Sequence, residues 1–177
     1  MPTTVRLPLE IRNPQISVNP GAAHFNVAAL TAWDAGYFVF DKTGNVDVVW
    51  FGLAFVPANM AVTPAAKIIC YWAANSTAGS NIRTQIAAGL VKSADTTNHW
   101  NRAALTAETA ITTTLSTTAW TQATVTYPAS GSLTNQPAAN DVYIVKITRL
   151  GSDTVNDTLT AATPAFLFGS FLQVDIT

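Results

Sequence analysis

Charged side chains are scarce in this chain. Only 11% of its 177 residues are Asp, Glu, Lys or Arg, whereas a typical soluble domain has about 25%. The net charge is −1 and the nine Lys and Arg residues are scattered, so we expect no basic surface for a phosphate backbone and no nucleic-acid partner. Because few charges keep copies apart and the mean hydropathy is positive, the composition favours contacts between subunits.

Cysteine is almost absent. The single Cys70 excludes an internal disulfide framework, and its neighbours Ile69, Tyr71 and Trp72 are typical of a buried, inert thiol. Long apolar runs are missing as well, since glycine and proline interrupt the candidates before the ~18 residues that a membrane span needs. We expect no membrane partner. The N-terminal residues lack the pattern of a secretory signal, which predicts a protein retained in the cytosol.

Residues suited to catalysis or metal binding are few. His24 and His99 are the only histidines, and they would have to meet beside a carboxylate or thiolate to act or to hold a metal. The closest carboxylates, Asp141, Asp153 and Asp157, lack the spacing of a compact calcium loop. No phosphate loop, nucleophile elbow or Cys-x-x-Cys pair occurs. We therefore expect no enzyme, no catalytic residue, no metal and no cofactor.

The sequence does contain a series of short β-forming runs. Apolar residues alternate or cluster over strand length between turn residues, with hardly any helical spacing. The runs lie at 46–56, 68–74, 82–90, 112–127, 141–149 and 168–174. Residues 103–110 are the only plausible helix. About eight strands at turn-bounded intervals predict an all-β fold, an antiparallel β-sandwich that is jelly-roll-like.

Two of these runs carry more detailed predictions. Alternation over the third run is expected to direct a set of apolar side chains inward, namely Ile82, Ile86, Ala88 and Leu90. The fourth run is crowded with threonine, a β-branched residue that suits a pleated, half-exposed surface. A strand is expected there, anchored by Trp120, Ala123, Val125 and Tyr127.

The beginning of the chain is punctuated by proline. Four prolines between Pro2 and Pro20 each fix φ and remove a backbone donor. They predict an extended N-terminal arm or edge segment over residues 1–32. Residues 33–177 then form a single jelly-roll domain. An arm laid over a neighbouring surface needs a partner, which again favours assembly.

One charged residue is expected inside the core. By strand alternation Arg149 shares a face with Tyr143 and Ile147. If that face is the core, the guanidinium must be paired, because an isolated buried charge is very costly. We predict a structural ion pair between Arg149 and either Asp153 or Asp157, which follow within the next turn.

Aromatic residues suggest one further contact. Most of the five tryptophans lie inside apolar runs and are expected to pack in the core or between subunits. Trp100 is different, because it follows His99 in a polar segment. These two residues are the candidates for contact with a glycan or a protein partner.

Several of these segments together resemble a known group of proteins. They are residues 141–149, Asp153, residues 157–159 and 168–174, and upstream residues 51–57 before 68–72. In their patterns of strand and turn they are similar to the small jelly-roll virion proteins of tailed bacteriophages, over residues 35–177. That group includes capsid decoration or cement proteins, head fibres and tail modules.

The resemblance implies a structural role. It implies a homotrimer in the virion, assembled in the host cytoplasm, with the major capsid protein or another virion protein as its partner. Such a subunit stabilises the shell by adding buried contacts. Burial of ~1,000 Å² or more of surface per contact would suffice for durable attachment. The alternative is a receptor- or carbohydrate-binding module of a tail fibre or baseplate.

Overall fold

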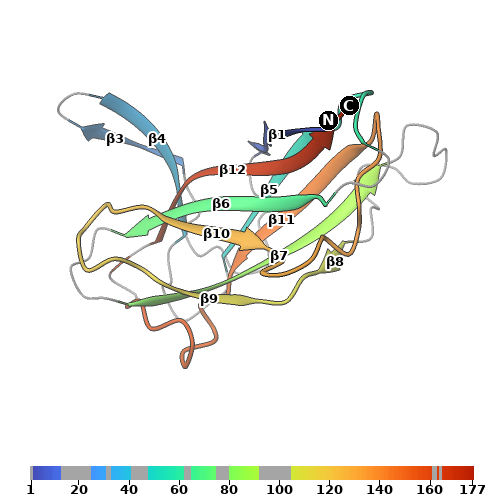
Figure 1. The fold of residues 1–177 in the computed structure, drawn as a ribbon. Helices are drawn as coiled ribbons and strands as arrows, with labels where there is room; N and C mark the ends of the chain where they lie inside the picture. Colours follow the sequence, from blue (N-terminus) through green and yellow to red (C-terminus); the bar gives the residue numbers. More distant parts are fainter. Residues whose placement is uncertain are drawn as a thin grey trace.

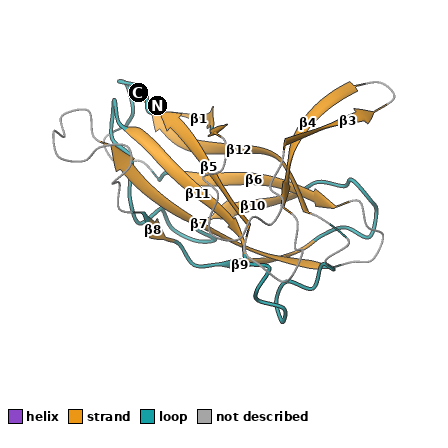
Figure 2. Cartoon of the chain, turned by 180° about the vertical axis from the view of Figure 1, so that it is seen from behind, coloured by secondary structure: helices purple, strands orange, loops and turns teal. Residues whose placement is uncertain are grey.

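The computed structural model describes residues 2–12, 25–30, 33–40, 48–61, 65–74, 80–91, 105–160, 163 and 165–177. All regular secondary structure in these residues is β-strand (Figure 2). The described residues contain no helix that could span a membrane. The strands are β1 (Thr3–Pro8), β2 (Glu10–Arg12), β3 (Phe25–Leu30), β4 (Trp33–Phe40), β5 (Val48–Phe55), β6 (Lys67–Ala74), β7 (Asn81–Val91), β8 (Thr106–Ala107), β9 (Ile111–Thr114), β10 (Ala123–Tyr127), β11 (Val142–Arg149) and β12 (Ala165–Ile176).

The strands form two antiparallel sheets that pack against each other (Figure 1). One sheet, which we call the β12 sheet, has the order β10-β6-β12-β4-β3, with β1 also paired to β12. The other, the β11 sheet, has the order β2-β5-β11-β7-β8, with β9 also paired to β7. The predicted fold class, an all-β antiparallel sandwich, is confirmed.

The order in which the chain visits the sheets is jelly-roll-like. From β4 to β12 each connection crosses from one sheet to the other, except where β7, β8 and β9 follow one another in the β11 sheet. Such double crossing places strands that are distant in sequence side by side, as in the β12·β6 and β11·β5 pairs. In the described residues the two sheets therefore cover the core between them, and no helix contributes.

The core lies between the two inner faces. On the β12 sheet Ile68, Cys70 and Trp72 are fully buried, and on the β11 sheet Ile82 and Ile86 are fully buried. These residues are two or four apart, as side chains on one face of a strand must be. The expected inward side chains of β7 therefore lie in the core, with Leu90 only half-buried. Pro57 lies two residues after the end of β5, as expected of a residue that cannot donate to a ladder.

One local prediction is wrong and another is confirmed only in part. The described part of 103–110 is not helical, because β8 adds two residues, Thr106 and Ala107, to the edge of β7. A helix this short is marginal by itself, so the available sheet edge decides its structure. The strand expected within 112–127 is present as β10, which contains Ala123, Val125 and Tyr127 but not Trp120. The beginning of the run belongs to a second strand, β9, in the other sheet. The chain turns between them, and Trp120 lies in that turn.

The N-terminal segment supplies edge strands wherever it is described. β1 runs along β12 from Thr3↔Ile176 to Pro8↔Phe171, and β2 pairs with β5 in the opposite sheet. Residues 13–24 and 31–32 of the expected arm lie outside the described residues.

β3 and β4 form an antiparallel hairpin that extends away from the two sheets (Figures 1 and 2). Only the last three residues of β4 pair with the sandwich, where Phe38 to Phe40 meet Ala165 to Leu167 of β12. β6 occupies the opposite edge of β12. β4 and β1 must therefore share the remaining edge, β4 at the beginning of β12 and β1 at its end.

Candidate functional site

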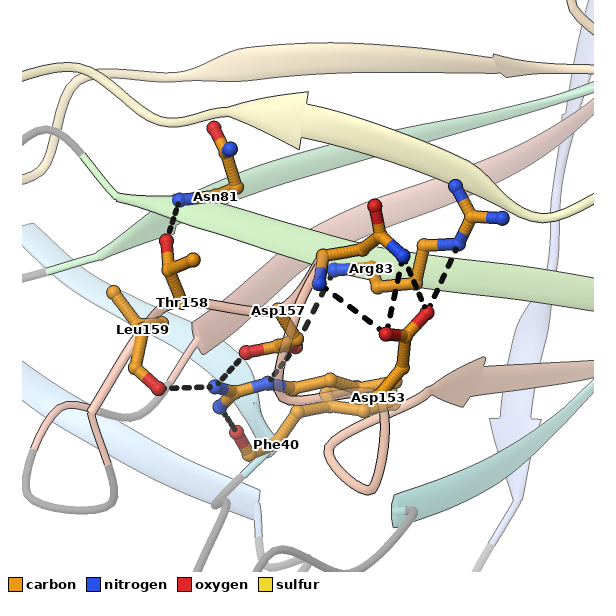
Figure 3. A network of polar contacts seen from close by, with 9 residues as sticks. Phe40, Asn81, Arg83, Asp153, Asp157, Thr158 and Leu159 are labelled. Atoms are coloured by element: carbon orange, nitrogen blue, oxygen red, sulfur yellow. Dashed lines mark hydrogen bonds and ion pairs between the residues drawn. The ribbon is translucent and has the colours of Figure 1, made fainter.

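Arg149 and Asp157 form a buried ion pair at one end of the sandwich. Both side chains are fully buried. The guanidinium Nε donates to Asp157 Oδ2 and Nη2 donates to Asp157 Oδ1, each at 2.9 Å (Figure 3). This is the bidentate geometry in which an arginine and a carboxylate bind most strongly. Alternation along β11 places Arg149 on the inner face, and the loop after β11 returns the carboxylate to it.

The remaining donors of Arg149 connect the two sheets. Nη1 donates to the carbonyl oxygen of Phe40 at 2.7 Å, and Nη2 reaches the carbonyl of Leu159 at 3.5 Å. Phe40 ends β4 in the β12 sheet, whereas Arg149 ends β11 in the β11 sheet. One buried side chain thus fixes both layers at this end of the sandwich.

Asp157 also binds the neighbouring strand. Its Oδ2 accepts from the backbone N–H of Arg83 in β7 at 3.3 Å. The adjoining residues Thr158 and Leu159 donate their backbone N–H groups to the carbonyl of Asn81, and the Thr158 hydroxyl accepts from Asn81 N at 2.9 Å. The loop 150–160 is therefore bound to the start of β7 (Figure 3), and both carboxylate oxygens of Asp157 accept bonds from this chain.

Asp153 lies in the same loop but does not contact Arg149. Its carboxylate accepts from the side-chain amide of Asn156 at 2.9 and 3.1 Å and from the backbone N–H of Asn156 at 3.2 Å. Arg83 Nε lies 3.8 Å away, at the distance of a loose ion pair. The hydrogen bonds from the Asn156 side chain are the main cause that lowers the pKa of Asp153 below its ordinary 3.8.

The pKa of Asp153 should depend on its hydrogen bonds to Asn156. Because the folded pKa is depressed, the contribution of this carboxylate to stability is present above pH 3.8 and is lost as the pH falls through the folded value. We expect its NMR titration midpoint to lie below 3.8 and to rise toward 3.8 in Asn156→Ala. Asn59→Ala, which removes an amide bound to the carbonyl of Thr177, should leave the midpoint unchanged. An unchanged midpoint in Asn156→Ala would show that the loop does not hold the carboxylate.

Of the other sequence candidates, the structure describes only Asp141. Asp141 accepts from the backbone N–H of Ala138 at 2.9 Å, as a local turn residue does. His24, His99 and Trp100 lie outside the described residues. Among the residues that are described, no group of three or more His, Cys, Asp or Glu side chains could hold a metal ion. What the described residues form here is a buried, bidentate ion pair between Arg149 and Asp157.

Cys70 lies in the core of the β12 sheet. Burial raises the pKa of its thiol to about 12, so the reactive thiolate is not populated near neutral pH. The native protein should therefore react with a thiol reagent such as DTNB at about pH 8 far more slowly than the guanidinium-unfolded protein. Rapid labelling of the native chain would contradict this burial. Labelling should accelerate in parallel with loss of structure as denaturant is added.

Sequence reasoning missed two buried polar contacts, of which the first joins the two sheets. The hydroxyls of Thr84 in β7 and Tyr127 in β10 form a hydrogen bond inside the core, and burial raises the pKa of Tyr127. Glu108, nearly buried, accepts from the backbone N–H of Thr134 at 2.7 Å. Periodicity could have placed Thr84 on the inner face of β7, because it lies between Ile82 and Ile86. Its partner depends on how the sheets pack.

Comparisons with known proteins reveal no relative from which a function can be read. No family model matches the chain, and no curated protein matches it. Among solved structures it is similar to an arabinose-bound GH51 α-L-arabinofuranosidase, with a TM-score of 0.37 and 11% sequence identity. The match covers 94% of this chain and 27% of that enzyme chain. A likeness this low supports no statement about activity.

Proposed function

We propose that this protein is a virion structural protein of a tailed bacteriophage, a capsid decoration or cement subunit that stabilises the shell through oligomeric contacts. The observation that carries the proposal is the β3–β4 hairpin, which leaves the sandwich and pairs with it over only three residues. Its partners are further copies of the chain, as a homotrimer, and a major capsid protein or another virion protein.

The hairpin is poorly suited to water. A two-stranded hairpin is marginally stable when it stands alone. The six residues of β3 and the eight residues of β4 include one charged residue, Asp34. A long strand pair with so little charge is prone to edge pairing and association. Contact with a neighbouring subunit would cover it and would make assembly part of its stability.

The rest of the molecule suits a rigid building block. The segments that carry the resemblance to phage jelly-roll proteins form β11, the buried Arg149–Asp157 pair and β12. These elements occupy the inside of both sheets, where they hold the two layers in one arrangement. With a net charge of −1, copies of the chain repel one another weakly. Both features support durable, repeated contacts in a shell.

Sedimentation velocity tests the assembly. The full chain is expected to sediment as a trimer, at three times the 18.7 kDa protomer mass. Val27→Lys with Leu30→Lys places two charges on β3 and should shift the protein to monomer. Val155→Lys is the matched control, because Val155 is 82% exposed in the loop 150–160 of the sandwich. A wild-type monomer, or trimers of all three proteins, would overturn the proposed role of the hairpin.

Copy number in particles tests the location. Quantitative mass spectrometry of purified virions should find the protein in hundreds of copies, as a shell subunit requires. A few copies per particle would instead indicate a tail fibre or baseplate module. Absence from virions would remove the proposal altogether.

A further inference from the structure

Trp120 has an unusual backbone for so large a residue. It lies in the turn between β9 and β10 with φ at 65°, in the left-handed region that bulky side chains rarely adopt. Such a conformation persists only where the surroundings enforce it, and it is concentrated at binding and catalytic sites. A tryptophan at a position that glycine or asparagine would occupy more easily suggests a use for the side chain.

The surroundings hold the indole against two aromatic side chains of β12. Its backbone N–H donates to the carbonyl of Ala74 at 2.7 Å. The ring stacks on Phe166, with centroids 4.8 Å apart and planes inclined by 22°, and Phe168 meets it edge-on at 6.4 Å. Phe166 is itself buried, and its neighbour Leu167 points into the core. Trp120 therefore lies on the outer face of the sheet with a rigid support beneath it.

The indole remains partly open to solvent, and the segment of chain that carries it is uncharged. Trp120 is 43% exposed. The turn also exposes a set of hydroxyl and amide side chains, namely Thr117, Thr118, Thr121, Gln122 and Thr124. No Asp, Glu, Lys or Arg occurs from residue 109 to residue 140. The chemistry gathered here is one aromatic face bordered by neutral hydrogen-bonding groups.

That chemistry matches a neutral sugar ring. The face of an indole is electron-rich, so it attracts the polarised C–H bonds on one side of a pyranose. Hydroxyl and amide groups at the border can bind the sugar hydroxyls, whereas a charged ligand would find no counter-charge. A standard protein interface buries about 800 Å² on each partner. One exposed indole among threonines is small for that and comparable with one sugar ring.

We infer that Trp120, supported by Phe166, is the stacking platform of a binding site for a neutral carbohydrate. Phe166 pairs with Val39 of β4 at the base of the β3–β4 hairpin, but sugar binding at Trp120 needs no contact between the hairpin and a neighbouring subunit, so the inference does not rest on the proposed role in a shell. It would allow a virion subunit, whether in the head or in the tail, to hold neutral polysaccharide on its outer surface.

Affinity electrophoresis of the purified full chain through gels containing neutral glucan, mannan or galactan tests the site. At least one of these polysaccharides should retard the wild type, and Trp120→Ala should weaken that binding about tenfold or more. Phe55→Ala is the matched control, because Phe55 is an aromatic residue 57% exposed on the β11 sheet. It should bind within about twofold of wild type.

Two further variants separate binding from folding. Trp120→Tyr keeps an aromatic face and should retain part of the affinity, whereas Trp120→Asn fits the left-handed backbone and should fold well without binding. Circular dichroism and thermal melting would verify the fold of each. The inference is overturned if no neutral polysaccharide retards the wild type, or if Trp120→Asn binds as tightly as Phe55→Ala. It is also overturned if the Trp120 variants change the sedimentation of the protein but not its retardation.

Discussion

Replacing Asp157 by asparagine is expected to lower the free energy of unfolding by about 3–5 kcal/mol. The change leaves the guanidinium of Arg149 fully buried without its counter-charge. Asparagine keeps the size of the side chain and one acceptor oxygen, so the loss reports the charge and not a cavity. The bond from Arg149 to the carbonyl of Phe40 remains, but a neutral oxygen cannot offset a buried cation.

Guanidinium denaturation followed by far-UV circular dichroism would measure the loss. Asp153→Asn makes the same chemical change four positions earlier in the same loop, on a side chain that is 32% exposed, and should cost much less. A double variant, Arg149→Met with Asp157→Leu, should be more stable than Asp157→Asn alone, because it removes both charges together. If the two asparagine variants were equally stable, the buried pair would not have the role assigned to it.

Truncating Trp72 to alanine should cost about 3–5 kcal/mol of unfolding free energy. The indole is fully buried in β6, in the middle of the β12 sheet. It meets Phe40 edge-on with centroids 4.8 Å apart, directly beside the carbonyl that Arg149 binds. Removing the indole would leave a cavity between the sheets that a rigid sandwich cannot close.

The phenylalanine variant of the same residue is the informative control. Trp72 Nε1 is buried and has no hydrogen-bond partner among the described residues, and an unsatisfied buried donor costs about 1–3 kcal/mol. Trp72→Phe removes that donor while it keeps an aromatic ring against Phe40. We expect it to lose clearly less stability than Trp72→Ala in chemical denaturation. Equal losses would mean that the N–H is satisfied, by water or by another group.

The sheets could be anticipated because burial on one face imposes a period of two. β11 illustrates this, since Tyr143, Val145 and Ile147 all face the core and Arg149 continues the same row. An arginine in that row can be accommodated only with a carboxylate, so the existence of an ion pair followed from the strand pattern. Aspartates at 153 and 157 were both within reach. Only the path of the loop 150–160 decides between them.

Other features depend on contacts that local sequence does not encode. The strand order is one, because every apolar run with the same period could pair with several others. Trp120 is another, since a Thr-rich segment favours extended backbone and gives no sign of a left-handed residue. The structure also shows that a short segment such as Thr106–Ala107 takes its conformation from a neighbouring edge, β7, and not from its own propensity.

The two halves of one edge of β12 give the molecule a direction. The hairpin joins at Ala165, whereas Thr3 pairs with Ile176 at the far end of the strand (Figure 1). Twelve extended residues span about 40 Å. Any polypeptide fused before residue 3 or after residue 176 would thus emerge at the pole opposite the hairpin. A fluorescent protein or affinity tag attached there would be held far from the β3–β4 hairpin.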